Sequence, residues 1–267
     1  MDADRLKPRN SGHLKSTDER KHLRLTEGRF HSNVRLKHSF TFVPPTTATL
    51  NRAAKLDLSN TKERILDASE RLFANHGFDA VSLRQITTDA GANLAAVNYH
   101  FGSKEALIAA VVGRYLEPIN VERLELLSAS EAAHAPDPVP ATEILDSLIR
   151  PVANMARHSR RSRGTFLKLV GRCMTQSGRS LPEAIRPALE NVILRFNAAL
   201  KRVLPDLAED TIHWRVHFAM GAFLFTLTQH EQLEVFSGGL CSADDLDKLL
   251  AEHIQFAGAG MTAPASR

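Results

Sequence analysis

The sequence predicts an all-α protein with an N-terminal three-helix helix-turn-helix domain and a C-terminal helical bundle. From about residue 60 onward, apolar residues recur at helical spacing, between capping residues and glycines that stop helices. Val, Ile and Thr nowhere alternate with polar residues in the two-residue period of a strand, which argues against a sheet. These two observations together set the fold class.

Composition places the chain among soluble proteins with an ordinary core. Apolar residues make up 43% of the sequence, and no apolar run reaches the length of a membrane span. The N-terminus carries scattered charges where a secretory signal would need an apolar centre, so we expect a cytoplasmic protein without membrane contact. Cys173 and Cys241, the two cysteines, exclude a disulfide scaffold and are interpreted as reduced thiols, with a redox sensor as the alternative.

The net charge of +4 is concentrated in the N-terminal segment. Residues 1–60 carry 12 Lys and Arg against 6 Asp and Glu, whereas residues 61–120 carry 6 against 7 and residues 121–267 carry 16 against 17. A hypothesis of DNA binding therefore has to rest on particular residues and not on overall charge.

Residues 1–58 are predicted to be a disordered basic extension. They lack sustained apolar periodicity and contain the break Pro44-Pro45. We favour the interpretation that the segment is dispensable or lies upstream of the true start. The alternative is a basic arm that adds nonspecific phosphate contacts.

The next segment, residues 59–118, is predicted to hold four short helices. The first begins at the capping box Asn60-Thr61-Lys62-Glu63 and ends at Gly77, and the second runs from the cap Ser82 to Gly91. The third follows the cap Asn93 and ends near Tyr99. The fourth begins at Ser103 and ends at Pro118.

Residues 119–141 are predicted to be a linker rich in Ala and Pro, and residues 142–260 a second helical domain. The apolar spacing in this second domain predicts five helices, and Pro187 should kink or restart the third of them. Their expected ranges are 142–157, 162–176, 181–203, 209–232 and 243–257.

The second and third helices of the first domain have the spacing of a helix-turn-helix motif, whose second helix enters the major groove of DNA. Ala95 and Ala96 are small enough to let the helix backbone approach base edges. The polar groups around these two alanines come from Asn93, Asn98, Tyr99 and His100. Thr61, Ser82 and Lys104 stand at helix starts, where a phosphate can be held. The alternative is an ordinary helical hairpin in which Asn and Tyr only cap and pack.

These residues resemble the DNA-binding domain of TetR-family regulators. The resemblance covers about residues 61–115 and rests on Gly77-Phe78, on Ser-Leu-Arg-Gln-Ile at 82–86, on Ala90-Gly91 and on Val-Asn-Tyr-His-Phe-Gly-Ser-Lys-Glu-Ala-Leu at 97–107. It implies a homodimer on a palindromic operator, released from DNA by a ligand of the C-terminal domain. It places Phe78, Phe101 and Leu107 in the core. The implied DNA contacts are Thr61, Ser82, Arg84, Asn93, Ala95, Ala96, Asn98, Tyr99, His100 and Lys104.

A second resemblance covers parts of both domains. Residues 93–104, with Trp-Arg-Val-His-Phe at 214–218 and Met-Gly-Ala at 220–222, are similar to the fatty-acid-responsive PsrA-type branch of the family. This resemblance implies a long-chain acyl ligand, as the free acid or the coenzyme A ester.

In the C-terminal domain the sequence indicates a dimer face and an apolar ligand cavity. One face of the segment 209–232 carries Trp214, Phe218, Gly221, Ala222 and Phe225, which is typical of a core or dimer seam. The resemblance pairs this face with the helix of residues 243–257, which contains Leu249. Arg172 has two interpretations, a partner for a ligand carboxylate or a surface arginine. The predicted ligand-binding residues are Met155, Phe166, Leu169, Val170, Arg172, Met174, Val192, Ile193 and Phe196.

An enzyme is the rival class, but the sequence contains neither a His-Glu-x-x-His motif, nor a nucleophile elbow, nor a phosphate-binding glycine loop. His213 and His217 have a spacing that metal sites use, but the sequence completes no known metal-binding motif around them, so we interpret them as structural and expect no metal, no cofactor and no catalytic residue. A DNA-binding activator, or a regulator controlled by protein partners, remains a further alternative.

Overall fold

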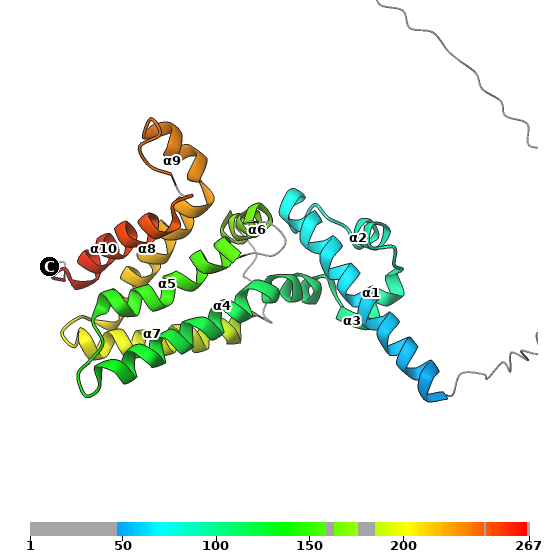
Figure 1. Ribbon diagram of the computed structural model, residues 1–267, viewed down its shortest axis with the longest axis horizontal. Helices are drawn as coiled ribbons and strands as arrows, with labels where there is room; N and C mark the ends of the chain where they lie inside the picture. The colour runs from blue at the N-terminus through cyan, green and yellow to red at the C-terminus, as the bar shows by residue number, and fades with distance from the viewer. Residues whose placement is uncertain (1–46, 159–162, 176–184, 243, 266–267) are drawn as a thin grey trace, which may run out of the picture. The chain divides into compact units, whose positions relative to one another are not determined.

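The computed structural model describes residues 47–158, 163–175, 185–242 and 244–265, and within these ranges the chain forms α-helices and no strand. The prediction of an all-α fold is confirmed (Figure 1). None of the helices in these ranges is both long and apolar enough to cross a membrane. The helices are α1 (Thr47–His76), α2 (Leu83–Ala90), α3 (Leu94–Phe101), α4 (Lys104–His134), α5 (Ala141–His158), α6 (Arg163–Thr175), α7 (Arg186–Val203), α8 (Glu209–Thr228), α9 (His230–Phe236) and α10 (Leu246–Thr262).

Helices α1 to α3 and the first turns of α4 enclose one apolar core. Phe73, Ile86, Val97 and Leu107 are fully buried in it. Leu107 is thus in the core, as the family resemblance implies. Phe78 and Phe101 are half-buried at the edge of the same cluster, and the ring of Phe78 lies 5.4 Å from that of Phe73.

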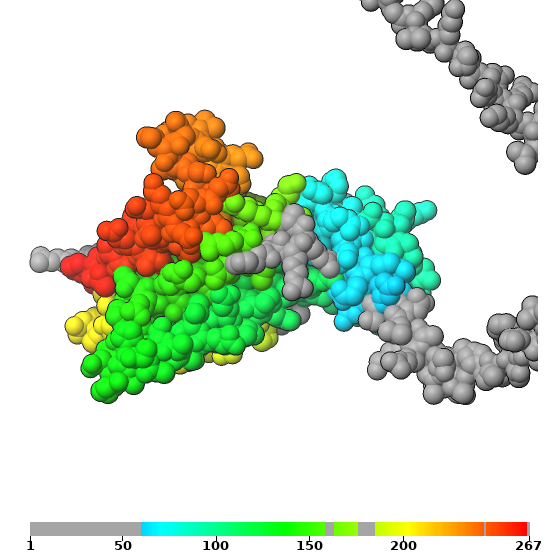
Figure 2. All heavy atoms as spheres, viewed as in Figure 1, coloured from blue at the N-terminus to red at the C-terminus, as the bar shows by residue number. Residues whose placement is uncertain are grey.

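A second core lies among α4, α5, α7, α8 and α10. Helix α5 packs against both α4 and α10 and supplies the fully buried residues Leu145 and Ile149. Phe196 of α7 and Phe223 of α8 close this core. Helix α9 has no buried residue and stands out from the neighbouring helices (Figures 1 and 2).

Two predicted helix boundaries in the N-terminal half are wrong. Helix α1 begins at Thr47, so residues 47–58 are helical and Asn60 lies inside the helix; residues 1–46 of the predicted extension lie outside the described residues. Residues 48–58 are rich in Ala and Leu, which favour helix. This local preference continues the helix upstream of the predicted cap.

Helix α4 continues through Pro118 to His134, which corrects both the predicted break and the predicted linker at 119–141. An interior proline costs about 3 kcal/mol because it removes one hydrogen bond and crowds the preceding turn. Beyond Pro118, however, Ile119 and Leu127 are buried in the second core. Their burial offsets the cost of the proline.

The C-terminal helices follow the prediction more closely. Helices α5 and α6 lie within a residue of the predicted ranges, and Pro187 stands in the first turn of α7, where its missing N–H costs nothing. Residues 162, 176, 181–184 and 243 of the predicted segments lie outside the described residues. The predicted segment 209–232 is divided, because α8 ends at Thr228 and α9 begins at His230.

Gly91 provides a test of the helix-turn-helix turn. Its φ is +58°, and its N–H donates to the carbonyls of Thr87 and Thr88. We expect Gly91→Ala to reduce the free energy of unfolding by about 1 kcal/mol, because a Cβ disfavours the left-handed conformation. Urea unfolding followed by circular dichroism measures the change.

Gly171 is the matched control, since it lies inside α6 with open space where a Cβ would stand. We expect Gly171→Ala to stabilise the protein by about 0.5–1 kcal/mol through helix propensity. Equal effects of the two substitutions would contradict the assigned turn geometry.

Candidate nucleic-acid interface and internal cavity

Helices α2 and α3 are held in a helix-turn-helix arrangement by side-chain caps at both starts. Ser82 Oγ accepts a hydrogen bond from the N–H of Gln85, while Gln85 Oε1 accepts from the N–H of Ser82 at 2.8 Å. Asn93 Oδ1 accepts from the N–H of Ala96 at 2.9 Å. These caps fix the first residues of α2 and α3. Helix α3 contributes one fully buried residue, Val97, to the core.

The predicted DNA contacts form the exposed part of this arrangement. Tyr99 is 73% exposed although it is aromatic, and its ring lies 5.0 Å from that of His100. A tyrosine exposed in this way offers a partner both an apolar ring and a hydroxyl that can form a hydrogen bond. Among the predicted contacts, Ser82, Arg84, Asn93, Ala95, Asn98 and Tyr99 are exposed, and Thr61, Ala96, His100 and Lys104 are half-buried.

Two of the predicted contacts already have protein partners. Thr61 Oγ1 accepts a hydrogen bond from Arg64 at 3.2 Å. Lys104 Nζ donates to the carbonyl of Asp79 at 3.4 Å, which holds the lysine at the start of α4. Ser82 and Asn93 likewise act as helix caps, so their side chains have a structural role whether or not they also contact DNA.

An apolar cavity of about 290 Å³ lies among α4, α5, α6, α7 and α8. Four of the predicted ligand-binding residues line it: Phe166, Leu169, Val170 and Met174. Cys173 also lines it, and burial raises the pKa of its thiol to about 11, so this side chain is neutral at physiological pH. The lining is thus apolar with few polar groups, which is the usual composition of a small-molecule site.

The other predicted ligand-binding residues lie elsewhere. Val192, Ile193 and Phe196 line a second cavity of about 250 Å³ between α4, α5, α7 and α8, and Met155 packs against the core. Arg172 lines a third, more polar cavity and donates to the carbonyl of Asn75 at 3.1 Å. The structure thus places Arg172 away from the apolar cavity.

Helix α4 supplies cavity residues that the sequence analysis missed. Tyr115, Leu116, Ile119 and Arg123 all line the apolar cavity. Ile119 and Arg123 were missed because a helix break was predicted at Pro118, and Tyr115 and Leu116 because their segment was assigned wholly to the first domain. The signal that reveals them is the apolar spacing that continues through Ile119 and Leu127 after the proline.

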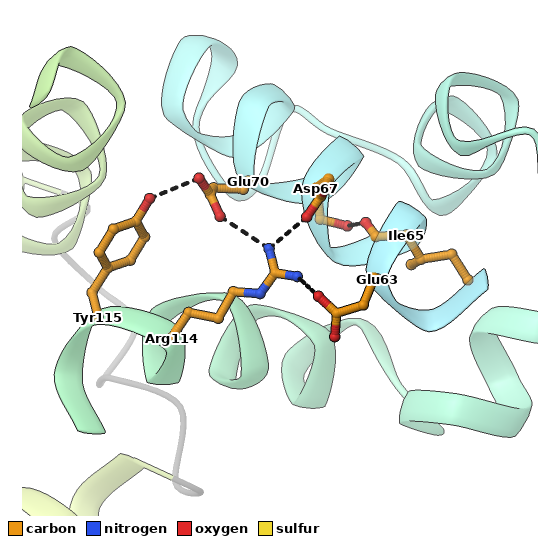
Figure 3. Close-up of polar contacts among 7 residues, drawn as sticks. Glu63, Ile65, Asp67, Glu70, Arg114 and Tyr115 are labelled. Atoms are coloured by element: carbon orange, nitrogen blue, oxygen red, sulfur yellow. Dashed lines mark hydrogen bonds and ion pairs between the residues drawn. The ribbon is translucent and has the colours of Figure 1, made fainter. Parts of the chain in front are cut away.

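Arg114 and Tyr115 connect this cavity wall to α1 of the helix-turn-helix domain (Figure 3). Arg114 forms ion pairs with Glu63, Asp67 and Glu70 of α1, and Tyr115 donates a hydrogen bond of 2.7 Å to Glu70. Burial acts to lower the pKa of Arg114, but the hydrogen bonds to Asp67 and Glu70 and the charge of Glu63 outweigh it and raise this pKa. The guanidinium therefore remains charged and holds α4 against α1.

Helix α6 makes a second connection to α1. Lys168 Nζ donates to Asn75 Oδ1 at 3.0 Å, and Arg172 donates to the carbonyl of the same residue, one position before the end of α1. A cation is favourable beside the carbonyls at the C-terminus of a helix. Because the opposite side of α6 lines the apolar cavity, a ligand there would contact the helix that touches α1.

The predicted dimer face on α8 is largely exposed. Trp214, Phe218 and Phe225 are each at least 60% exposed, and the rings of Trp214 and Phe218 are stacked with centroids 5.7 Å apart. Gly221 and Ala222 are half-buried, and Leu249 of α10 is half-buried against the core.

The sequence predicts no metal site at His213 and His217, although their spacing would suit one. His213 lies within hydrogen-bond distance of Asn197 Nδ2, at 3.1 Å. Within the described ranges, no group of three or more His, Cys, Asp or Glu side chains is arranged to hold a metal ion.

Together these features define a helix-turn-helix regulator whose second domain contains an apolar cavity. Comparison with known proteins agrees with this class. Residues 65–111 match the model of bacterial regulatory proteins of the tetR family, and residues 146–260 match that of the tetracyclin repressor-like C-terminal domain. The two matches cover more than half of the chain, and the chain belongs to the TetR family of DNA-binding transcriptional regulators, which are not enzymes.

Two curated relatives illustrate how the similarity is distributed. The uncharacterized HTH-type transcriptional regulator YerO of Bacillus subtilis is 39% identical over 59 residues, which are 22% of this chain and 20% of YerO. The HTH-type transcriptional repressor AcnR of Corynebacterium diphtheriae is 23% identical over 203 residues, which are 73% of this chain and 90% of AcnR. The higher identity is thus confined to a segment that spans a fifth of YerO.

Solved structures show the same fold at low sequence identity. A tetR-family regulator of Shewanella sp. PV-4 has a TM-score of 0.51 and 16% identity, covering 76% of this chain and 99% of its own. SmeT of Stenotrophomonas maltophilia has a TM-score of 0.50 and 20% identity, covering 78% of this chain and 96% of its own.

The Arg114 cluster provides a stability test. We expect Arg114→Met to reduce the free energy of unfolding by about 2–3 kcal/mol, because the carboxylate of Glu70, 3% exposed, loses a neighbouring positive charge. Urea unfolding of the purified protein measures this change.

The matched control is Arg150→Met. Arg150 pairs with Asp146 four residues earlier on α5, and both side chains are partly exposed. Removal of such a pair should cost less than about 1 kcal/mol. If both variants lost the same stability, the Arg114 cluster would not be a special link between α1 and α4.

Proposed function

We propose that the protein is a homodimeric cytoplasmic repressor that binds a palindromic operator and leaves it when a small apolar effector occupies the cavity. A long-chain fatty acid or its coenzyme A ester is the proposed effector, in keeping with the resemblance to the PsrA-type branch. The names of AcnR and SmeT, both described as repressors, support repression as the mode of action.

The observation that carries this proposal is the double role of Tyr115. Its side chain lines the apolar cavity, and its hydroxyl bonds to Glu70 of the first DNA-binding helix. An effector in the cavity would contact α4 and α6, and both of these helices also contact α1.

Release from DNA would follow from a shift between two shapes of the dimer. Two recognition helices of a dimer bind one face of DNA when they lie about 34 Å apart, which is one helical turn of B-DNA. An effector that binds a different shape more tightly weakens operator binding by its differential affinity for the two shapes.

A gel-shift experiment on the DNA upstream of the protein's own gene tests the function. We expect the protein to retard this fragment, and a long-chain acyl-coenzyme A or the free fatty acid to release it. Failure to retard any promoter fragment would overturn the assignment as a repressor. Retardation that no acyl compound relieves would instead favour control by another effector or by a protein partner.

A double variant serves as the control for the DNA surface. Tyr99→Ala with Lys104→Ala should weaken binding about tenfold to a hundredfold, since a base contact and a phosphate contact are lost. The matched double variant on α7, Leu194→Ala with Arg186→Ala, changes an exposed apolar and an exposed cationic residue outside the motif and should bind normally.

The exposed face of α8 predicts the oligomeric state. We expect the wild-type chain to be a dimer in sedimentation equilibrium and Phe218→Glu to be a monomer, because a buried unpaired carboxylate would oppose association. Leu194→Glu on α7 is the control and should remain dimeric, since Leu194 is 70% exposed outside the proposed interface. A monomeric wild-type protein would contradict the proposal.

A further inference from the structure

Arg123 of α4 is a buried arginine at the junction of two cavities. Its residue exposure is 5%, and it lines both the apolar cavity of about 290 Å³ and the second cavity of about 250 Å³. Leu189 and Met220 also line both cavities. The two spaces therefore adjoin at Arg123, Leu189 and Met220.

The hydrogen bonds of Arg123 within the described ranges go to neutral acceptors. Its Nε donates to the carbonyl of Leu148 at 2.8 Å, and its Nη1 donates to Asn120 Oδ1 at 3.0 Å. Its Nη2 makes no hydrogen bond, and no carboxylate forms an ion pair with the guanidinium, in this part of the chain. By contrast, Arg114, Arg150 and Arg195 each pair with a carboxylate.

Burial lowers the pKa of Arg123 to about 10, which leaves the side chain protonated at neutral pH. A buried cation without a counter-charge costs several kcal/mol of desolvation. An apolar residue of similar size would avoid that cost. Packing alone therefore does not explain why a cation is buried at this position.

We propose that Arg123 binds the carboxylate of an amphipathic organic acid whose hydrocarbon part fills the apolar cavity. This inference rests on the proposed function and names the head group of its effector. A guanidinium matches a carboxylate because its N–H groups form a planar fork, and Nη2 is the donor that the protein leaves for it. Leu116, Phe166 and Val170 offer the hydrocarbon an apolar wall.

The lining of both cavities agrees with an anionic head group at this position. Among the described residues, neither cavity is lined by an aspartate or a glutamate. Asn197, His213 and His217 line the second cavity but not the apolar cavity. His213 and His217 are also exposed, so the second cavity borders solvent.

The arrangement distinguishes the two forms of the proposed effector. A free acid presents a charged carboxylate at the end of its chain, whereas the thioester carbonyl of a coenzyme A ester is neutral. Hydrogen bonds between charged groups stabilise more than those between neutral groups. The site at Arg123 therefore selects the free acid.

Isothermal titration of the full-length protein with dodecanoate and with dodecan-1-ol, both below their aggregation concentrations, tests the site. We expect the wild-type protein to bind the acid at least about tenfold more tightly than the alcohol. Arg123→Met should abolish this preference without weakening the binding of the alcohol. Arg123→Lys keeps the charge and should retain part of the preference.

Arg150→Met is the matched control, because Arg150 lines neither cavity and should not affect the titration. Equal affinity of the wild-type protein for acid and alcohol would overturn the inference, as would a folded Arg123→Met variant that still prefers the acid. If Arg123→Met does not fold, the wild-type comparison and Arg123→Lys decide the outcome.

The titration involves no DNA, so its result is separate from the gel shift. Tight binding of dodecanoate by a protein that retards no DNA would overturn the proposed repressor and keep the site. Operator binding without a preference for the acid would overturn the site and keep the repressor.

Discussion

The structure depends on the ion pairs between Arg114 of α4 and the carboxylates of α1. Glu70 is buried, so its negative charge needs a nearby cation, and Arg114 supplies it while also reaching Glu63 and Asp67. The position of α4 relative to the helix-turn-helix core is thereby fixed by electrostatics as well as by packing. Because the same helix continues past Pro118, a displacement of the part after Pro118 would also displace the part before it.

This continuity gives α4 a role in both domains. Leu107 belongs to the N-terminal core, Tyr115 lies at the cavity wall, and Leu127 belongs to the C-terminal core. Helix α6 has a similar double position, since Leu169 packs in the N-terminal core and lines the cavity. A ligand in the cavity would thus contact the two elements through which the C-terminal bundle touches the DNA-binding helices.

The sequence was sufficient where local signals decide the structure. Caps such as Ser82 and Asn93 and the stop at Gly91 give nearly correct bounds for α2 and α3, because each signal acts within one turn of the helix end. Local signals failed at Asn60 and Pro118. There, helix propensity upstream of Asn60 and core burial after Pro118 outweighed a local preference worth a few kcal/mol at most.

By itself, the sequence determined the all-α class, the helix-turn-helix motif and an apolar cavity lined by Phe166, Leu169 and Val170. Periodicity and capping are properties of neighbouring residues, and they can be read along the chain. Only the tertiary structure decided which arginine is buried beside the cavities. Arg172 looked central in the sequence but contacts Asn75, whereas Arg123 is buried between two cavities. The reason is that the burial of Arg123, and its lack of an ion-pair partner among the described residues, depend on five helices packed together, which no single segment of sequence encodes.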